Sequence, residues 1–260
     1  MNDLNVLKFA ISLAFVFINV ANADTYKTYD GAWAAKYALK NYDQPYPPSN
    51  GNPFQNFEKR DSAGNLIPDG GNCTNFVSQA LIAGFIQNDS MKTVFENRYE
   101  FDTDYSTANY TKAWYYRNDS QRGPAWSGAP KLFEYADKNI ETFRGVHFKK
   151  ITSDSSTSFM DYNSVRVGDI IFADWGRDTN NDKKVDSDAD GTIDHSMIVT
   201  SYDYWTQFGY NKIQVTYQSK NKTRRLGDIN EENTYIKNGK KIYAARFYVY
   251  RPTNYNPDGK

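Results

Sequence analysis

Cysteine is the scarcest reactive residue in this sequence of 260 residues, which contains Cys73 alone. A single cysteine excludes an intramolecular disulfide. Histidine is nearly as scarce, since only His147 and His195 occur. A zinc site built from one cysteine and two histidines lacks a ligand unless carboxylates complete it, and any cysteine–histidine pair must use Cys73. The lone thiol is therefore either a buried packing residue or a group that does chemistry.

The sequence also lacks an excess of charge, because 31 Lys and Arg residues balance 31 Asp and Glu residues. A net charge of zero removes the general electrostatic argument for nucleic acid or an anionic membrane as a partner. Aromatic residues are abundant at 16%. This abundance favours a β-rich or α+β body over a helical bundle.

Long hydrophobic runs are missing except near the first residue, where Lys8 precedes an apolar run over residues 9–20. The small residues Ala21 and Ala23 then fit a cleavage site. This pattern predicts a signal peptide over residues 1–23, cleaved before Asp24, and a secreted or periplasmic product. A membrane anchor is the alternative, but the run is shorter than the roughly 20 residues that a span needs. We expect no membrane association after signal removal.

Helices precede strands along the chain, which predicts a single α+β domain over residues 24–260. Helices are expected at residues 29–41, 73–83 and 130–143, from helix-forming residues and apolar spacing. The proline-rich stretch 42–72 is expected to be extended, and residues 84–123 show no clear period. Strands are expected at residues 146–151, 169–173, 196–202, 213–217 and 243–250.

The segment around Cys73 is the strongest chemical signal. Apolar residues follow Cys73 at helical spacing up to Gly84, which is expected to close the helix, so the thiol heads a buried face. Asn72 is a favoured N-cap residue and would place Cys73 in the first turn. There the helix dipole and unpaired N–H groups stabilise a thiolate. The alternative is a small cysteine packed at a helix start.

His195 is the better candidate for a base of the two histidines. It opens a predicted strand that turns apolar, so it would lie at a sheet edge against which the Cys73 helix can pack. His147 lies inside a predicted strand and is expected to face solvent. A histidine held by local hydrogen bonds at a strand end is the alternative interpretation of His195.

Five segments resemble the motifs of the putative amidase domain of bacterial secreted proteins, in the NlpC-type and papain-like cysteine hydrolase superfamily. The segments are residues 29–42, 73–79, 168–175, 190–196 and 217–225. The resemblance implies a papain-like fold, with the nucleophile helix packed on an antiparallel sheet. It also implies amide hydrolysis with Cys73 and His195 as the catalytic pair.

Two positions depart from the family pattern. Asn72 stands where the family has aspartate, and Gln218 stands where it has histidine. A papain-like site needs a polar group to orient the imidazole, and the side-chain carbonyl of Gln218 or Asn221 could do this. Asn221 matches the family residue and is slightly favoured.

An acidic run over residues 178–194 separates two of the predicted strands and is expected to be an inserted loop. Oxygen side chains recur there at alternate positions, as in the front half of an EF-hand loop, although the bidentate Glu of that loop is absent. The linked spacing resembles thrombospondin type 3 or dockerin-type loops. We predict a structural Ca²⁺ site and no organic cofactor; the alternative is a solvated acidic loop. The candidate ligands are Asp178, Asn180, Asp182, Asp186, Asp188, Asp190 and Asp194.

These observations favour a secreted or periplasmic cysteine amidase or endopeptidase. The expected substrate is a peptidoglycan stem peptide or another peptide, and an antibacterial toxin role would imply a cognate inhibitor or immunity protein. One alternative is a Ca²⁺-stabilised module that binds glycan or peptide on an inactive hydrolase fold. Another is an acyltransferase that forms the same thioester, because the sequence does not distinguish water from an amine as acyl acceptor.

Overall fold

A computed structural model gives the structure of the chain between Lys27 and Asn256. The described residues are 27–44, 53–55, 57, 62, 72–101, 114–118, 120–138, 145–152, 162–180, 182, 184–203, 212–218 and 222–256. The predicted signal peptide, most of the proline-rich stretch and Asn221 lie outside these residues.

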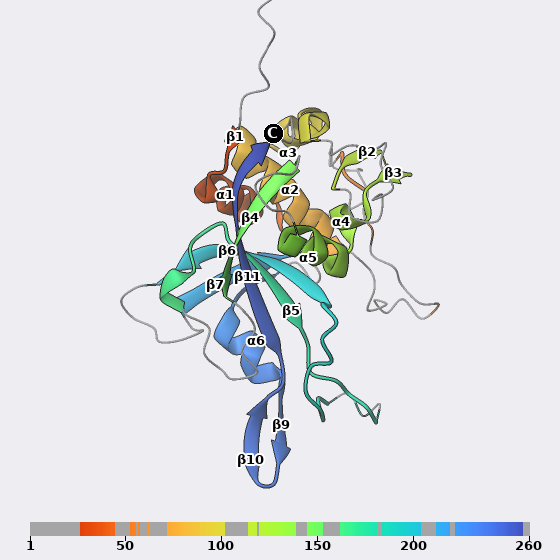
Figure 1. The fold of residues 1–260 in the computed structure, drawn as a ribbon, viewed down its shortest axis with the longest axis vertical. Coiled ribbons are helices and arrows are strands. Elements are labelled where there is room, and N and C mark those ends of the chain that lie inside the picture. Colours follow the sequence, from red (N-terminus) through yellow and green to blue (C-terminus); the bar gives the residue numbers. More distant parts are fainter. Residues whose placement is uncertain are drawn as a thin grey trace, which may run out of the picture.

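One antiparallel sheet of seven strands forms the centre of the molecule. Its order is β1-β11-β5-β6-β7-β8, and β4 also pairs with β11. The strands are β1 (Lys27–Thr28), β4 (Gly145–Thr152), β5 (Ile170–Asp174), β6 (His195–Tyr202), β7 (Ile213–Tyr217), β8 (Lys222–Arg225) and β11 (Arg246–Asn256). The long strand β11 pairs with β5 along its first half and with β4 and β1 further on, so it joins β4 and β1 to the rest of the sheet (Figure 1).

Two small hairpins lie outside this sheet. They pair β2 (Tyr116–Asn118) with β3 (Gln121–Arg122), and β9 (Thr234–Lys237) with β10 (Lys240–Tyr243). Asn238 and Gly239 join β9 to β10 with φ values of 53° and 74°, as a tight hairpin turn requires. This second hairpin projects from the body beyond β11 (Figure 1).

Six α-helices are present in the described part of the chain. They are α1 (Gly31–Asn41), α2 (Asn72–Ile86), α3 (Met91–Glu96), α4 (Pro124–Ser127), α5 (Ala129–Lys138) and α6 (Leu226–Glu232). Local signals explain where several of them begin. The Asp30 carboxylate accepts the Ala32 N–H at 2.9 Å and caps α1, and Ser90 caps α3 in the same way. Pro124 occupies the first turn of α4, where its missing N–H has no cost.

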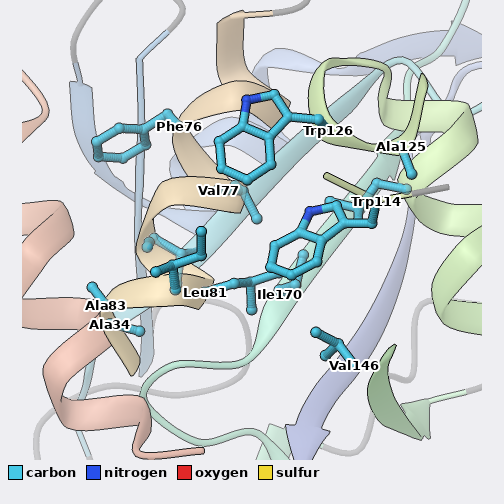
Figure 2. Packing of buried hydrophobic residues seen from close by; sticks show 14 of the residues in the cluster. Ala34, Phe76, Val77, Leu81, Ala83, Trp114, Ala125, Trp126, Val146 and Ile170 are labelled. Atoms are coloured by element: carbon cyan, nitrogen blue, oxygen red, sulfur yellow. The ribbon is translucent and has the colours of Figure 1, made fainter. Parts of the chain in front are cut away.

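The sheet separates two hydrophobic cores. On one face α1, α2, α4 and α5 cover Ile170, Phe172 and Ile198, and Figure 2 shows Trp114 and Trp126 packed beside α2 in this core. On the other face α6 covers the residues that alternate with these, including Ile171, Met197 and Val199. The mixed architecture with an antiparallel sheet confirms the α+β prediction.

Several predicted boundaries differ from the observed ones. Helix α2 continues past Gly84 to Ile86, so the prediction that Gly84 closes it is wrong. A Cβ at Gly84 would lie 2.3 Å from the Tyr29 ring, so this glycine permits close packing. The expected strand 243–250 is split between β10 and β11. His147 is only 2% exposed, so its predicted solvent-facing position is also wrong: it lies where the pairing of β4 with β11 is irregular, and the Thr253 hydroxyl donates to its carbonyl at 3.2 Å.

Candidate active site

The start of α2 places the Cys73 thiol inside the protein. Cys73 is the second residue of α2 and is 4% exposed, and the helix is buried on all sides from Asn72 to Phe85. Asn72 is the first helical residue and not the N-cap that the sequence predicted. The first-turn position of Cys73 is nevertheless confirmed, and the N–H groups of a first helical turn have no partner within the helix.

The start of β6 brings His195 to the same place. Helix α2 packs against β6, and the residues that follow Cys73 and His195 are joined directly, because the Ser196 hydroxyl donates to Thr74 Oγ1 at 3.0 Å. This buried bond fixes the register between the helix start and the strand start. The structure thus brings together the two residues that the sequence selected as nucleophile and base.

The surroundings of Cys73 favour its thiolate. Burial by itself would raise the pKa of the thiol, but the charge of His195 and a hydrogen bond from its side chain lower it. The Ser196 backbone N–H and the Thr74 side chain add further hydrogen bonds to the sulfur. Together these interactions lower the pKa of Cys73 to about 6. At neutral pH the thiolate is therefore the major form.

Two aromatic rings hold the imidazole of His195, and sequence analysis did not single out either. Tyr217, the last residue of β7, lies edge-on to it with ring centroids 4.9 Å apart. Trp175 lies 5.9 Å away at an interplanar angle of 36°. His195 is 8% exposed, and no group in the described residues hydrogen-bonds to its buried Nε2 atom. The alternation of β7, which turns Tyr217 to the face of His195, could have identified this contact.

The two candidates for the third catalytic residue have different outcomes. Gln218 is fully buried, and it bonds to Asn72 Nδ2 at 3.0 Å and to the Asn41 carbonyl at 3.2 Å. Gln218 therefore bonds to the residue that precedes Cys73, and it does not bond to Nε2 of His195. Asn221 lies outside the described residues, so its role stays a prediction. The two positions at which the sequence departs from the family pattern, 72 and 218, are thus direct partners.

Arg177 pairs with two carboxylates of the acidic loop, one of which directly precedes His195. This guanidinium contacts Asp190 at 2.7 Å and Asp194 at 3.3 Å, and Asp194 also accepts the Trp175 N–H at 2.8 Å. The hydrogen bond from Arg177 contributes most to lowering the pKa of Asp190 to about 2. Asp194 directly precedes His195, so these contacts fix the beginning of β6.

The remaining candidate calcium ligands bond within the loop or to the neighbouring hairpin. Backbone N–H groups donate to Asp178, Asn180 and Asp182, Thr179 donates to Asp186, and the Tyr235 hydroxyl donates to Asp188. Within the described residues, no three His, Cys, Asp or Glu side chains converge in a way that could hold a metal ion. The described arrangement does not assemble a cation site, and the calcium site stays a prediction.

Comparison with known proteins gives one match. The family described as "Putative amidase domain" matches residues 28–248, which include both Cys73 and His195. No curated protein and no solved structure matches the chain. Among the helices of the described residues, none combines the length and the apolar character that a membrane span requires.

Proposed function

Because the chain belongs to the putative amidase domain family, we propose that it is a cysteine amide hydrolase with Cys73 as nucleophile and His195 as general acid and base. Family membership supports hydrolysis of amide bonds in general. The observation that carries the finer proposal is the pairing of the single thiol with His195, which lowers the thiol pKa to about 6.

The reaction follows from these two groups. The Cys73 thiolate attacks the amide carbonyl carbon, and the C–N bond breaks as the protonated His195 gives its proton to the leaving amine. Water then attacks the thioester while His195 accepts a proton from it, and the C–S bond breaks, which releases the carboxylic acid and regenerates the Cys73 thiolate beside protonated His195. Unpaired N–H groups in the first turn of α2 are suited to stabilise the oxyanion of each tetrahedral intermediate.

We place this chemistry on a papain-like or NlpC-type fold. A nucleophile in the first turn of a buried helix and a base at the start of an adjacent antiparallel strand support that assignment. The predicted signal peptide supports a secreted or periplasmic location, and peptide bonds of peptidoglycan are the substrate that we propose for that location. An antibacterial role, with a cognate inhibitor protein, is the extension of this proposal.

Product analysis tests the proposal. The mature chain, residues 24–260, is incubated with defined muropeptides in H₂¹⁸O, and the products are read by mass spectrometry. Hydrolysis predicts cleavage of one amide bond, with ¹⁸O in the new carboxylate and no product from Cys73→Ala. Transfer to an added amine without ¹⁸O incorporation would identify an acyltransferase instead. Binding of muropeptides without any product would favour an inactive binding module.

A further inference from the structure

A chain of four side-chain hydrogen bonds crosses the protein next to the nucleophile. Trp126 Nε1 donates to Asn75 Oδ1 at 2.7 Å, and Asn75 Nδ2 donates to Asn72 Oδ1 at 3.0 Å. Asn72 Nδ2 donates to Gln218 Oε1 at 3.0 Å, and Gln218 Nε2 donates to the Asn41 carbonyl at 3.2 Å. We call Asn75, Asn72 and Gln218 the amide chain.

The two ends of the amide chain determine its direction. The indole N–H of Trp126 can only donate, and the backbone carbonyl of Asn41 can only accept. Each amide between them must therefore turn its oxygen toward Trp126 and its nitrogen toward Asn41. A reversed amide would place two donors or two acceptors against each other, so only one orientation satisfies every bond.

The amide chain is buried and carries no charge. Asn72 is 1% exposed, and Asn75 and Gln218 are fully buried, so loss of one partner would leave the next polar group without water. Since no member titrates, the geometry of the amide chain does not change with pH. It connects α4, the first turn of α2, the end of β7 and the end of α1, which are distant in sequence.

The end of β7 contacts both sides of the catalytic pair. Gln218 bonds to Asn72, which directly precedes Cys73. The preceding residue, Tyr217, places its ring against the imidazole of His195. Two adjacent residues thus fix the start of α2 and the ring of the base from one strand end.

We propose that Gln218 and Asn72 are positioning residues that hold the Cys73 thiol in register with His195 through the amide chain. This role rests on the proposed function, but it differs from that of a third catalytic residue, because Gln218 bonds to Asn72 on the nucleophile side and not to the Nε2 atom of His195. The two residues keep the thiol where His195 and the Ser196 N–H stabilise the thiolate.

The rate of Cys73 alkylation by iodoacetamide as a function of pH tests this role without any substrate. In Gln218→Met the side-chain volume is kept but both hydrogen bonds are lost. We expect the midpoint pH of Cys73 alkylation to move from near 6 toward the ordinary pKa of a thiol, and the alkylation rate at pH 7 to fall about 10-fold. The matched control is Gln79→Met, which removes a fully buried glutamine from α2, the helix that carries Cys73, where Gln79 accepts a hydrogen bond from the Tyr37 hydroxyl at 2.7 Å. The control should lower the melting temperature but leave the alkylation midpoint unchanged.

A second variant tests whether the polar bonds themselves matter, and it also serves if Gln218→Met does not fold. In Gln218→His a neutral imidazole offers one acceptor and one donor, as the amide does, whereas a protonated imidazole offers donors only. At pH 7.5 the variant should be alkylated within about 3-fold of the wild-type rate at that pH. At pH 5.5 its rate should fall well below the rate of the wild type at pH 5.5.

Three results would overturn the positioning role. The first is an unchanged midpoint pH of Cys73 alkylation in Gln218→Met, and the second is an equal shift of that midpoint in Gln79→Met. The third is a Gln218→His variant whose alkylation rate matches that of the wild type at both pH values. A wild-type chain that alkylates with a midpoint near 6 but cleaves no amide would refute the proposed function and leave the positioning role standing.

Discussion

At the scale of single residues, the Cys73 thiol is a buried group whose pKa is set by burial and by three neighbours, of which His195 lowers it most. Burial raises its pKa, and the interactions with His195, Ser196 and Thr74 outweigh burial and lower the pKa to about 6. A lowered pKa means that the thiolate, and with it the rate of alkylation, increases as pH rises through about 6 and is nearly constant above 7.

Replacement of His195 tests which neighbour matters most. We expect His195→Ala to move the alkylation midpoint of Cys73 above 8 and to reduce amide hydrolysis by roughly 1000-fold or more, since the imidazole stabilises the thiolate and moves the proton. His147→Gln is the matched control, because His147 is also buried in a strand but has no part in the proposed site. The opposite ranking of the two histidines would refute the assignment of the base.

At the scale of elements, α1 is held against the turn before β5 by two glycines that touch. Gly168 has φ +88°, and a Cβ on it would lie 2.2 Å from the Gly31 Cα. The flexible end of a side chain could yield to such a contact, but the backbone of a helix cannot. Because the end of α1 also accepts the bond from Gln218, this contact helps to set the position of the amide chain.

Alanine substitution separates the contribution of this contact from that of backbone strain. Gly168→Ala and Gly239→Ala each place a Cβ at a positive φ, at a cost of about 1 kcal/mol. Nothing lies within 4 Å of a Cβ at Gly239, so only Gly168→Ala also displaces a helix. We expect Gly168→Ala to lower the free energy of unfolding by about 3 kcal/mol or more. If urea denaturation gives the same loss in free energy of unfolding for both variants, α1 shifts away from a Cβ at residue 168 without further cost.

The sequence predicted elements best where one local signal dominated. The helix after Asn72 and the strand after His195 follow from apolar spacing, and the structure has both. The end of α2 was missed because the packing of Gly84 against Tyr29 is a tertiary contact that local propensity does not encode. Helix α6 was missed as well. It is a short helix, and its place depends on the burial of Leu226 and Ile229 in the second core, which also contains strand residues such as Ile171 and Met197.

The same distinction applies to the site. Cys73 and His195 could be found from the sequence because each begins an element with a clear apolar pattern. The bond from Asn72 to Gln218 could not, since it joins residues 146 positions apart and its direction is set by Trp126 and Asn41. Spacing also does not indicate that the Arg177 guanidinium pairs with carboxylates of the acidic loop, because Arg177 precedes the run of carboxylates in the sequence.

At the scale of the whole molecule, the acidic loop links the connection between β10 and β11 to the start of β6, where the proposed base His195 lies. The Ala189 N–H donates to the Ala244 carbonyl between β10 and β11, while Arg177 bonds to Asp190 and to Asp194 beside His195. We expect Arg177→Ala to lower both the melting temperature and the rate of hydrolysis, because two neighbouring carboxylates lose their counter-charge. The control Lys184→Ala removes a positive charge from the same loop, and among the residues that the structure describes Lys184 has no ion-pair partner. Lys184→Ala should change neither the melting temperature nor the rate of hydrolysis. If Lys184→Ala and Arg177→Ala have equal effects, the cause is the loss of a positive charge and not the ion pairs of Arg177.

The response to calcium then tests the remaining sequence prediction. Arg177 already holds the carboxylates of Asp190 and Asp194, so a cation would compete with the guanidinium for these oxygens. If the loop binds Ca²⁺ as its spacing predicts, addition of Ca²⁺ should raise the melting temperature more in Arg177→Ala than in the wild type, since the variant leaves both carboxylates free for the ion. Chelation should reverse the rise, and Asp188→Ala combined with Asp190→Ala should abolish it. If neither Ca²⁺ nor chelator changes the melting temperature of either protein, the loop is a solvated acidic segment that Arg177 and the hydrogen bonds of Asp188 and Ala189 hold in place.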